Sequence, residues 1–455
     1  MRILEVGLVV MTLGVGGVRF FWRHRTGRVV GAAVLAATLV AHLLWEGPRW
    51  QMTGVYLVVA LMIVWRLLGL ARSRIDGRRR WPVVLGLTVV GLSALLSWSL
   101  PVPRLPEPTG PLAIATTSWA LTDQSRDDPY DGEEGRPRRL VAQAWYPTDT
   151  PGPPAPLVSD PETFAAAVAP RVGLPSFALR HLNLVDTTAT LDAPIKDGTW
   201  PVVVYSHGWR GFRTVQSDLA ESLASNGYIV VALDHTYGAS VALFPDGDAV
   251  RLNSAALPEE QQVGPVAYQR ASAVLEATYA ADVAFLLDQL AAGQGPSQLG
   301  TDLQADRVGL VGHSTGGGAM IRLCLTDDRC AAMLGFDPWV EPVPSDLLQQ
   351  GLSQPLLSIR SAAWQGNDND AVLTALHGRS PASEGLVVVP DTLHGDFTLL
   401  PFLTPLSGLL GLSGDTDTAA MHRAVDTVAL DFFDRHLDGQ DIDQVALPAP
   451  LRRDG

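Results

Sequence analysis

Cysteine is scarce in this chain: its 455 residues include two, Cys324 and Cys330. Neither lies in a CxxC motif or in a Cys/His cluster with the spacing of zinc ligands, so we expect no metal site and no other cofactor. The five residues between them include Thr326, Asp327 and Asp328, which could form a turn that brings the sulfurs together. The pair is therefore either a disulfide or two reduced, buried thiols, depending on the compartment.

The larger, C-terminal part of the chain has no Lys/Arg-rich stripe, and the sequence has no internal repeat. Residues 1–100 hold twelve arginines and three acidic residues, for a formal charge of +9, and the remainder holds 21 basic and 44 acidic residues, for −23. This balance argues against nucleic acid as a partner. The first 100 residues are therefore basic and apolar, and the rest of the chain is acidic and polar.

Residues 1–100 contain four apolar stretches, each near the length that crosses ~30 Å of hydrocarbon. They are Ile3–Trp22, Val29–Trp45, Met52–Leu70 and Trp81–Leu100. One such stretch could be a signal peptide or a core helix, but four in succession, flanked by Trp and Arg, predict four transmembrane helices. We therefore expect residues 1–100 to cross the cell membrane several times, so that the lipid bilayer is a partner of the chain.

The arginines of this segment predict its orientation. They concentrate in the first loop (Arg23, Arg25, Arg28) and in the third loop (Arg72, Arg74, Arg78, Arg79, Arg80). By the positive-inside rule both loops face the cytoplasm, and an even number of spans then places the rest of the chain on the extracytoplasmic side. Arg19 and Arg66 lie near the cytoplasmic ends of their spans, where we expect them to snorkel.

A Pro-rich linker, residues 101–110, leads into a predicted domain of residues 111–440 and a solvated polar tail, 441–455. Short apolar runs of strand type alternate there with amphipathic stretches, which predicts an α/β domain with a mostly parallel, eight-stranded sheet covered by helices. The runs are Leu112–Trp119, Leu140–Trp145, Val202–Tyr205, Ile229–Leu233, Val308–Val311, Ala331–Gly335, Leu356–Ile359 and Leu386–Val389. The helices include Thr214–Asn226, Gly264–Ala292 and Met421–Leu437.

The sharpest motif is Gly-His-Ser-Thr-Gly at residues 312–316, between a predicted strand and a predicted helix. A strand-to-helix elbow holds a serine on a strained turn with its hydroxyl exposed, as in the α/β-hydrolase fold. Ser314 is thus the predicted nucleophile, with a plain Gly-rich turn as the alternative.

A serine nucleophile needs a base, which a third group orients. His394 follows the last apolar run, where this fold delivers its base, whereas we expect His377, His422 and His436 to be solvated or capping residues. The acid stays open between Asp337, after Ala331–Gly335, and Asp368 or Asp370, after the next strand. Asp396 is too near the base in sequence, so we expect it to cap the following helix.

An oxyanion hole needs two N–H donors. We predict the amides of Thr315, which follows the nucleophile, and Trp209, in the loop after the strand Val202–Tyr205. Buried histidines in such loops more often brace the backbone than act on substrate, which is the expected role of His207 and His235. Phe212 and Trp339 either line an acyl pocket or pack in the core.

These motifs resemble the platelet-activating-factor acetylhydrolase family, over about residues 110–440. The resemblance is carried by residues 204–214, 223–230 and 312–317, by Phe336-Asp337-Pro338-Trp339, and by His394 with Asp396-Phe397. It implies Asp337 as the acid beside Ser314 and His394, and esters with short or oxidised acyl chains, often on phospholipids, hydrolysed without metal. The chain departs from the family's pattern at Trp209, which replaces a smaller apolar residue, and in its membrane helices, which replace surface-binding ones.

The sequence as a whole predicts a membrane-anchored serine carboxylic-ester hydrolase that acts on small or short-acyl, including phospholipid, esters. The alternatives are a non-catalytic ligand-binding homologue and a lipid acyltransferase. The sequence does not indicate the oligomeric state.

Overall fold

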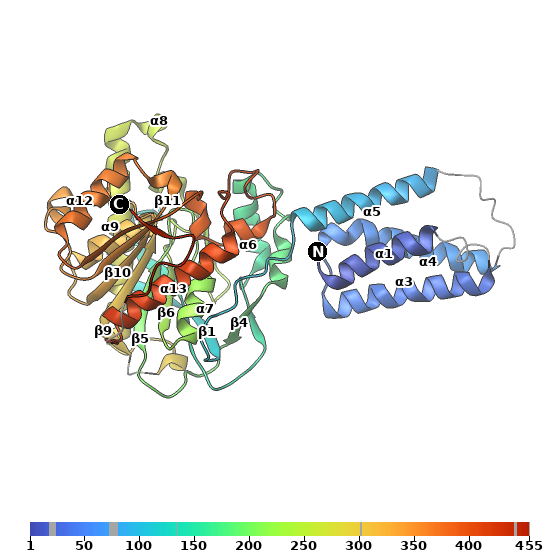
Figure 1. The fold of residues 1–455 in the computed structure, drawn as a ribbon, viewed down its shortest axis with the longest axis horizontal. Coiled ribbons are helices and arrows are strands. Elements are labelled where there is room, and N and C mark those ends of the chain that lie inside the picture. The colour runs from blue at the N-terminus through green and yellow to red at the C-terminus, as the bar shows by residue number, and fades with distance from the viewer. Residues whose placement is uncertain (18–23, 72–80, 134, 301–302, 441–443, 455) are drawn as a thin grey trace. The chain divides into compact units, whose positions relative to one another are not determined.

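The computed structural model describes residues 1–17, 24–71, 81–133, 135–300, 303–440 and 444–454. The chain divides into two compact units (Figure 1). One comprises Met1–Arg104 with Leu403–Leu406, and the other comprises Leu105–Phe402 with Ser407–Gly455. Each unit has a hydrophobic core of its own.

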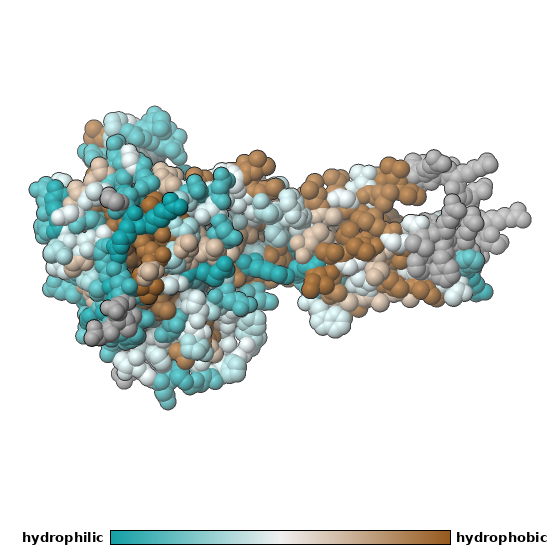
Figure 2. Space-filling view, in the orientation of Figure 1, coloured by the Kyte–Doolittle hydropathy of each residue, from teal (hydrophilic) through white to brown (hydrophobic). Residues whose placement is uncertain are grey.

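The first unit is a bundle of apolar helices, α1 (Ile3–Gly17), α3 (Arg25–Trp45), α4 (Thr53–Ala71) and α5 (Trp81–Ser99). Each coincides with one of the four stretches expected to span a membrane. Among the described residues, two ranges are long and apolar enough to cross a bilayer, Arg25–Trp45 and Trp50–Leu68, while Ile3–Gly17 and Val83–Ser99 are shorter apolar helices. Apolar residues cover much of the outer surface of these helices (Figure 2).

Arg66 does not snorkel as we expected. Its guanidinium is buried, and one nitrogen, Nη2, donates to the backbone oxygen of Val15 at 2.7 Å. Val15 belongs to α1, so a neighbouring helix of the bundle offers this cation an acceptor. Arg19, Arg23 and the arginines of the third loop lie outside the described residues.

The second unit is built on an eleven-stranded sheet, counted over the described residues, in the order β13-β12-β11-β10-β9-β5-β6-β2-β1-β4-β3. All eight predicted runs form strands of this sheet. They are β1 (Ile114–Asp127), β2 (Pro137–Pro147), β5 (Pro201–Ser206), β6 (Ile229–Asp234), β9 (Gln304–His313), β10 (Cys330–Phe336), β11 (Leu356–Ser361) and β12 (Ser383–Val389). Six neighbouring strands, from β12 to β6, run parallel, and β2 is antiparallel to both of its neighbours.

The expected number of eight strands was too low, because three further short strands join the sheet at its two ends. They are β3 (Pro154–Pro156), β4 (Asp186–Leu191) and β13 (Arg452–Arg453), and none is an apolar run. Each of these strands has exposed residues, and a strand that is not buried on both faces needs no continuous apolar sequence. In the C-terminal tail, β13 pairs with β12 while both of its residues are exposed, and only the preceding Leu451, which is buried, departs from the expected solvated tail among these residues.

Helices cover both faces of the sheet. Side chains alternate between the faces along each strand, and the central strands are apolar at nearly every position, so both faces are apolar and need cover. Val203 and Val230 point to the face covered by α7 (Ser217–Ser225) and α13 (Thr418–His436), and Figure 1 shows α13 lying across the sheet. Val202 and Leu310 point to the face covered by α9 (Pro265–Ala291) and α10 (Thr315–Cys324). The three helices that the sequence predicted in this unit correspond to α7, α9 and α13.

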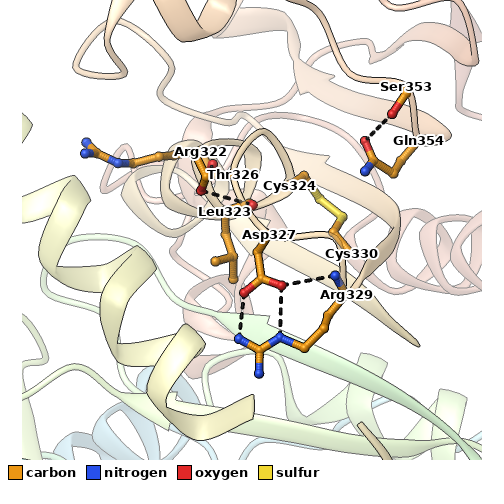
Figure 3. The surroundings of a disulfide bond; sticks show 9 residues. All are labelled: Arg322, Leu323, Cys324, Thr326, Asp327, Arg329, Cys330, Ser353 and Gln354. Carbon is orange, nitrogen blue, oxygen red and sulfur yellow. Dashed lines mark hydrogen bonds and ion pairs between the residues drawn. A yellow bond between two sulfur atoms is a disulfide. The ribbon is translucent and has the colours of Figure 1, made fainter. Parts of the chain in front are cut away.

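Cys324 and Cys330 are joined by a disulfide that links the end of α10 to the start of β10 (Figure 3). Both cysteines are buried. In the loop between them, the Asp327 carboxylate accepts hydrogen bonds from the backbone N–H and the Nε of Arg329, at 3.0 and 2.9 Å. The sequence left open a disulfide or two reduced thiols, and the structure has the disulfide. The residues between the two cysteines form the turn that the sequence indicated.

Candidate active site

Ser314 occupies the turn between β9 and α10, with a backbone φ of 54° and ψ of −122°. Such a conformation costs a non-glycine residue on the order of 1–3 kcal/mol and persists only where the surroundings impose it. Here the Ser314 N–H donates to Phe336 O at 3.0 Å, and the Trp339 N–H donates to Ser314 O at 2.9 Å. The segment around Asp337 therefore fixes the turn from both sides of the serine.

Two glycines let neighbouring backbones approach this turn. A Cβ on Gly316 would lie 2.2 Å from Ser206 O, and a Cβ on Gly208 would lie 2.8 Å from the Ser314 Cβ. Neither position has room for a side chain. The end of β5 and the loop that follows it therefore lie directly against Ser314.

His394 and Asp337 are brought together although 57 residues separate them in sequence. The His394 Nδ1 lies 3.0 Å from the Asp337 Oδ2, and the carboxylate is fully buried while the imidazole is 34% exposed. The backbone N–H and the hydroxyl of Ser361, at the end of β11, donate to the two carboxylate oxygens at 2.7 and 2.6 Å. A carboxylate on Nδ1 leaves Nε2 as the nitrogen that can take a proton.

The other candidate acids have different partners. Asp370 forms an ion pair with Arg360 and accepts from Gly366 N at 2.7 Å. Asp368 is the first residue of α12 (Asp368–Arg379). Asp396 accepts from the backbone N–H of Leu393 at 2.7 Å, as a cap of the one-turn helix that begins at His394, and from Gly414 N at 2.8 Å. The sequence left open whether the acid is Asp337, Asp368 or Asp370. In the structure, Asp337 is the one of these three whose carboxylate contacts His394.

The imidazole of His394 lies between two other rings. Trp364 stacks on it with ring centroids 4.4 Å apart and an angle of 8°, and His313 stacks on it at 4.4 Å and 29°. Two rings cannot stack on one face at the same distance, so they cover opposite faces. His313 Nε2 also donates to the backbone oxygen of His394 at 3.1 Å.

Sequence reasoning missed Ser361, His313 and Trp364. A signal was present, because Ser361 and Trp364 lie at the carboxyl end of a parallel strand, and His313 is the variable residue before the serine in the Gly-x-Ser-x-Gly motif. Carboxyl ends of parallel strands meet at the sheet edge where sites form in open α/β folds. This topological rule predicts the edge of the sheet at which the site lies, but it does not predict which side chains contact His394 and Asp337 there.

The predicted oxyanion donors, Thr315 and Trp209, belong to the two segments that adjoin Ser314. Thr315 is the first residue of α10, where N–H groups have no partner within the helix. Trp209 follows Gly208 in the loop after β5. His207 braces this loop, because its Nδ1 donates to Gly208 O at 2.7 Å and its Nε2 accepts from His235 N at 3.2 Å. Burial lowers the pKa of His207 to about 3, so the ring is neutral.

His235 also has the structural role that we expected. Its Nδ1 lies 3.0 Å from Asp282 on α9, and its Nε2 lies 2.9 Å from the hydroxyl of Ser206. Asp282 in turn pairs with the buried Arg138 of β2 at 2.7 Å. This chain of buried contacts ties the end of β5 to β2, two strands away in the sheet, and to the covering helix α9.

The expectation of solvated or capping histidines was wrong for His377 and His422, which are buried. His377 bonds to the hydroxyls of Ser358 and Ser383 at 2.9 and 2.7 Å. His422 donates from one nitrogen to Asp218 and from the other to the backbone oxygen of Asp396. Since both partners are acceptors, the ring carries a positive charge, and it holds the loop of His394 to α7.

The pKa of His422 follows the same geometry. Burial alone would lower it, but the adjacent Asp218 carboxylate overcomes that effect and raises the pKa. His436, on the same helix, lies 2.5 Å from Glu384.

The two aromatic candidates for an acyl pocket face different neighbours. Phe212 packs edge-to-face on Phe164 with centroids 4.9 Å apart. The ring centroid of Trp339 lies 6.2 Å from that of Tyr268 in α9, and the Trp339 indole N–H donates to the Glu341 carboxylate at 3.2 Å. Each is only partly buried. No group of three or more His, Cys, Asp or Glu side chains within the described ranges could hold a metal ion.

The parallel sheet, the antiparallel second strand and the serine elbow define the class of the second unit, an α/β-hydrolase-like fold. A solved ferulic acid esterase from Streptomyces cinnamoneus has the same fold, with a TM-score of 0.65 and 25% identity over 78% of this chain and 99% of the esterase.

Residues 177–256 and 276–448 match the family described as platelet-activating factor acetylhydrolase, isoform II, and the chain belongs to this family. It is 26% identical to platelet-activating factor acetylhydrolase of Cavia porcellus over 370 residues, 76% of this chain and 80% of the relative. It is also 26% identical to a probable 1-alkyl-2-acetylglycerophosphocholine esterase of Arthroderma benhamiae, over 74% of this chain and 89% of that relative. The chain is therefore a carboxylic ester hydrolase.

The stacked Trp364 gives a testable prediction for the site. Replacing it by alanine frees one face of the His394 ring and removes a π-face that favours an imidazolium, an interaction of about 0.5–2 kcal/mol. We expect Trp364→Ala to lower kcat about fivefold to twentyfold, with a smaller change in KM, and Trp364→Phe to restore most of kcat. Steady-state kinetics on a soluble ester measure this, and equal kcat for wild type and both variants would contradict a positioning role.

Proposed function

We propose that the chain hydrolyses small or short-acyl esters, including those of phospholipids, through a Ser314–His394–Asp337 triad. The observation that carries the proposal is the 3.0 Å contact between His394 Nδ1 and the buried Asp337, beside the strained turn of Ser314. His313 and Ser314 are consecutive, and the ring of His313 stacks on His394. A nucleophile, a base and an orienting acid are the parts that acyl transfer requires.

In the proposed mechanism, His394 Nε2 takes the hydroxyl proton of Ser314 while Oγ attacks the ester carbonyl. The N–H groups of Trp209 and Thr315 stabilise the resulting oxyanion, and Asp337 stabilises the imidazolium. Collapse of the tetrahedral intermediate breaks the bond to the alcohol, which leaves with the proton from His394. Water then attacks the acyl-enzyme by the same route in reverse and releases the acid and free Ser314.

The preference for short acyl groups is supported by the relatives. The Cavia porcellus relative is named as an acetylhydrolase, and the Arthroderma benhamiae relative is named as an esterase of a compound that carries an acetyl group. Phe212 and Trp339 are the aromatic side chains of this chain that we propose to bound the acyl group, and Trp339 is held next to Ser314 by its own backbone N–H.

Activity against a series of p-nitrophenyl esters and short-chain phospholipids tests this function. We expect kcat/KM to fall as the acyl chain lengthens beyond a few carbons. Ser314→Ala should lower turnover at least about a thousandfold, since removal of a triad serine abolishes the covalent step. Equal turnover by wild type and Ser314→Ala would refute the assignment.

We also propose that the N-terminal helices anchor the chain in the cell membrane by four passes, with the hydrolase domain on the extracytoplasmic side. Support comes from the apolar helices α1, α3, α4 and α5 and from the arginine-rich loops between them. The Cys324–Cys330 disulfide also favours this side, because disulfides persist outside the reducing cytoplasm.

Reporter fusions after Gly455 test this orientation. Alkaline phosphatase, which needs an oxidising compartment, should be active at this position, and green fluorescent protein exported there should stay dark. A fluorescent fusion together with an inactive phosphatase would place the domain in the cytoplasm.

A further inference from the structure

Residues 257–275, which we call the α8 segment, lie between the two ranges that match the family. The segment contains α8 (Glu260–Val263) and the first turns of α9, and Figure 1 shows α8 projecting from the body of the domain. Because the α8 segment is not part of the family match, its own contacts are what indicate its role.

The start of the α8 segment contacts the loop that carries the proposed oxyanion donor Trp209. The Glu259 carboxylate lies 3.4 Å from Nη2 of Arg210, the residue that follows Trp209. About half of each side chain is exposed, so this ion pair contributes little to stability. It nevertheless places the start of the segment beside the loop after β5, whose Gly208 lies against Ser314.

Further along, the α8 segment contacts the other backbone stretch that adjoins the serine, residues 336–339. The ring centroid of Tyr268 lies 6.2 Å from that of Trp339, with 40° between the rings, which is within the range of an aromatic contact. The Trp339 N–H donates to Ser314 O at 2.9 Å, so one side chain separates Tyr268 from the residue bonded to the serine. The chain from Glu259 to Tyr268 thus runs from one neighbour of Ser314 to the other.

Tyr268 is held by a helix that belongs to the core of the domain. Ser272 and Leu275, four and seven positions later on α9, are buried, and side chains at this spacing share one face of a helix. The Ser272 hydroxyl donates to Tyr268 O at 2.8 Å. Since the Tyr268 side chain is itself partly buried, it lies on the face of α9 that packs against the domain.

A glycine on α10 is where Trp339 and α9 both approach that helix. A Cβ on Gly318 would lie 2.0 Å from Trp339 O and 3.8 Å from the Glu276 Cγ of α9. The backbone of Trp339 and the helix that carries Tyr268 therefore pack on the same residue of α10, the helix that begins after Ser314. This packing fixes α9 relative to Trp339 independently of the contact between the two rings.

We propose that Tyr268 closes the acyl side of the site next to Trp339 and limits the length of the acyl chain. The proposal rests on the proposed function, in which Trp339 bounds the acyl group. A ring on a helix anchored in the core has little room to move aside, and forcing additional methylene groups against a packed side chain is unfavourable. The volume of the Tyr268 ring sets the limit, and its hydroxyl does not.

The acyl-chain preference of the full-length chain in detergent tests this proposal. p-Nitrophenyl butyrate and p-nitrophenyl octanoate share their leaving group and differ in acyl length, and their partition into detergent is the same for every variant. Tyr268→Ala should raise the octanoate-to-butyrate ratio of kcat/KM at least about tenfold, the scale on which a pocket discriminates one methylene group. Tyr268→Phe, which keeps the ring, should have the wild-type ratio, and Tyr268→Trp, which enlarges it, should have a lower one.

Val266→Ala is the matched control for the loss of an apolar side chain from the α8 segment. Val266 lies in the same turn of α9 as Tyr268 but is 72% exposed, and residues two apart on a helix do not face the same way. The octanoate-to-butyrate ratio should therefore stay at the wild-type value. An equal rise of the ratio in Val266→Ala and Tyr268→Ala would refute a specific role of Tyr268.

The outcomes separate this proposal from the proposed function. If wild type hydrolyses the butyrate ester and Tyr268→Ala keeps the wild-type ratio, the role of Tyr268 is refuted and the proposed function stands. If Tyr268→Ala loses turnover of both esters, Tyr268→Trp decides, because a lower ratio supports the proposal and an unchanged ratio refutes it. If wild type hydrolyses neither ester, or Ser314→Ala hydrolyses the butyrate ester as fast as wild type, the proposed function fails, and the proposal fails with it.

Discussion

The strained turn at Ser314 is the constraint on which the rest of the site depends. An L-residue adopts a φ of 54° with a ψ of −122° only when its neighbours leave no alternative. Here the backbone of residues 336–339 bonds to both sides of the serine, and Gly208 and Gly316 let the end of β5 close in on it. The turn that exposes the hydroxyl therefore also sets the positions of Asp337, Trp209 and Thr315.

The proposed base is held by contacts of a different kind. Asp337 and its two bonds from Ser361 fix one edge of the His394 ring, and Trp364 and His313 cover its faces. The loop that carries the ring is held in turn by the cationic His422, which joins it to Asp218 of α7. A ring fixed at its edge and on both faces loses little further orientational freedom when it takes a proton, which is the benefit of a pre-organised site.

Local patterns in the sequence predicted much of this arrangement. Continuous apolar runs identified eight of the strands, and the Gly-His-Ser-Thr-Gly motif identified the elbow, because each signal lies within a few consecutive residues. The short strands β3, β4 and β13, at the two ends of the sheet, carry no such signal. Asp337 could not be separated from Asp370 on the residues alone, since both follow parallel strands and only the fold pairs Asp370 with Arg360. The buried positions of His377 and His422 likewise depend on partners that lie elsewhere in the fold.

The central claim is that Ser314 is the residue that becomes acylated. A fluorophosphonate reacts with an activated serine and leaves a stable adduct, which peptide mass spectrometry assigns to one residue of the full-length chain. We predict a stoichiometric adduct on Ser314 that forms in step with the loss of esterase activity. Loss of activity with an unmodified Ser314, or with the adduct on another serine, would contradict the account.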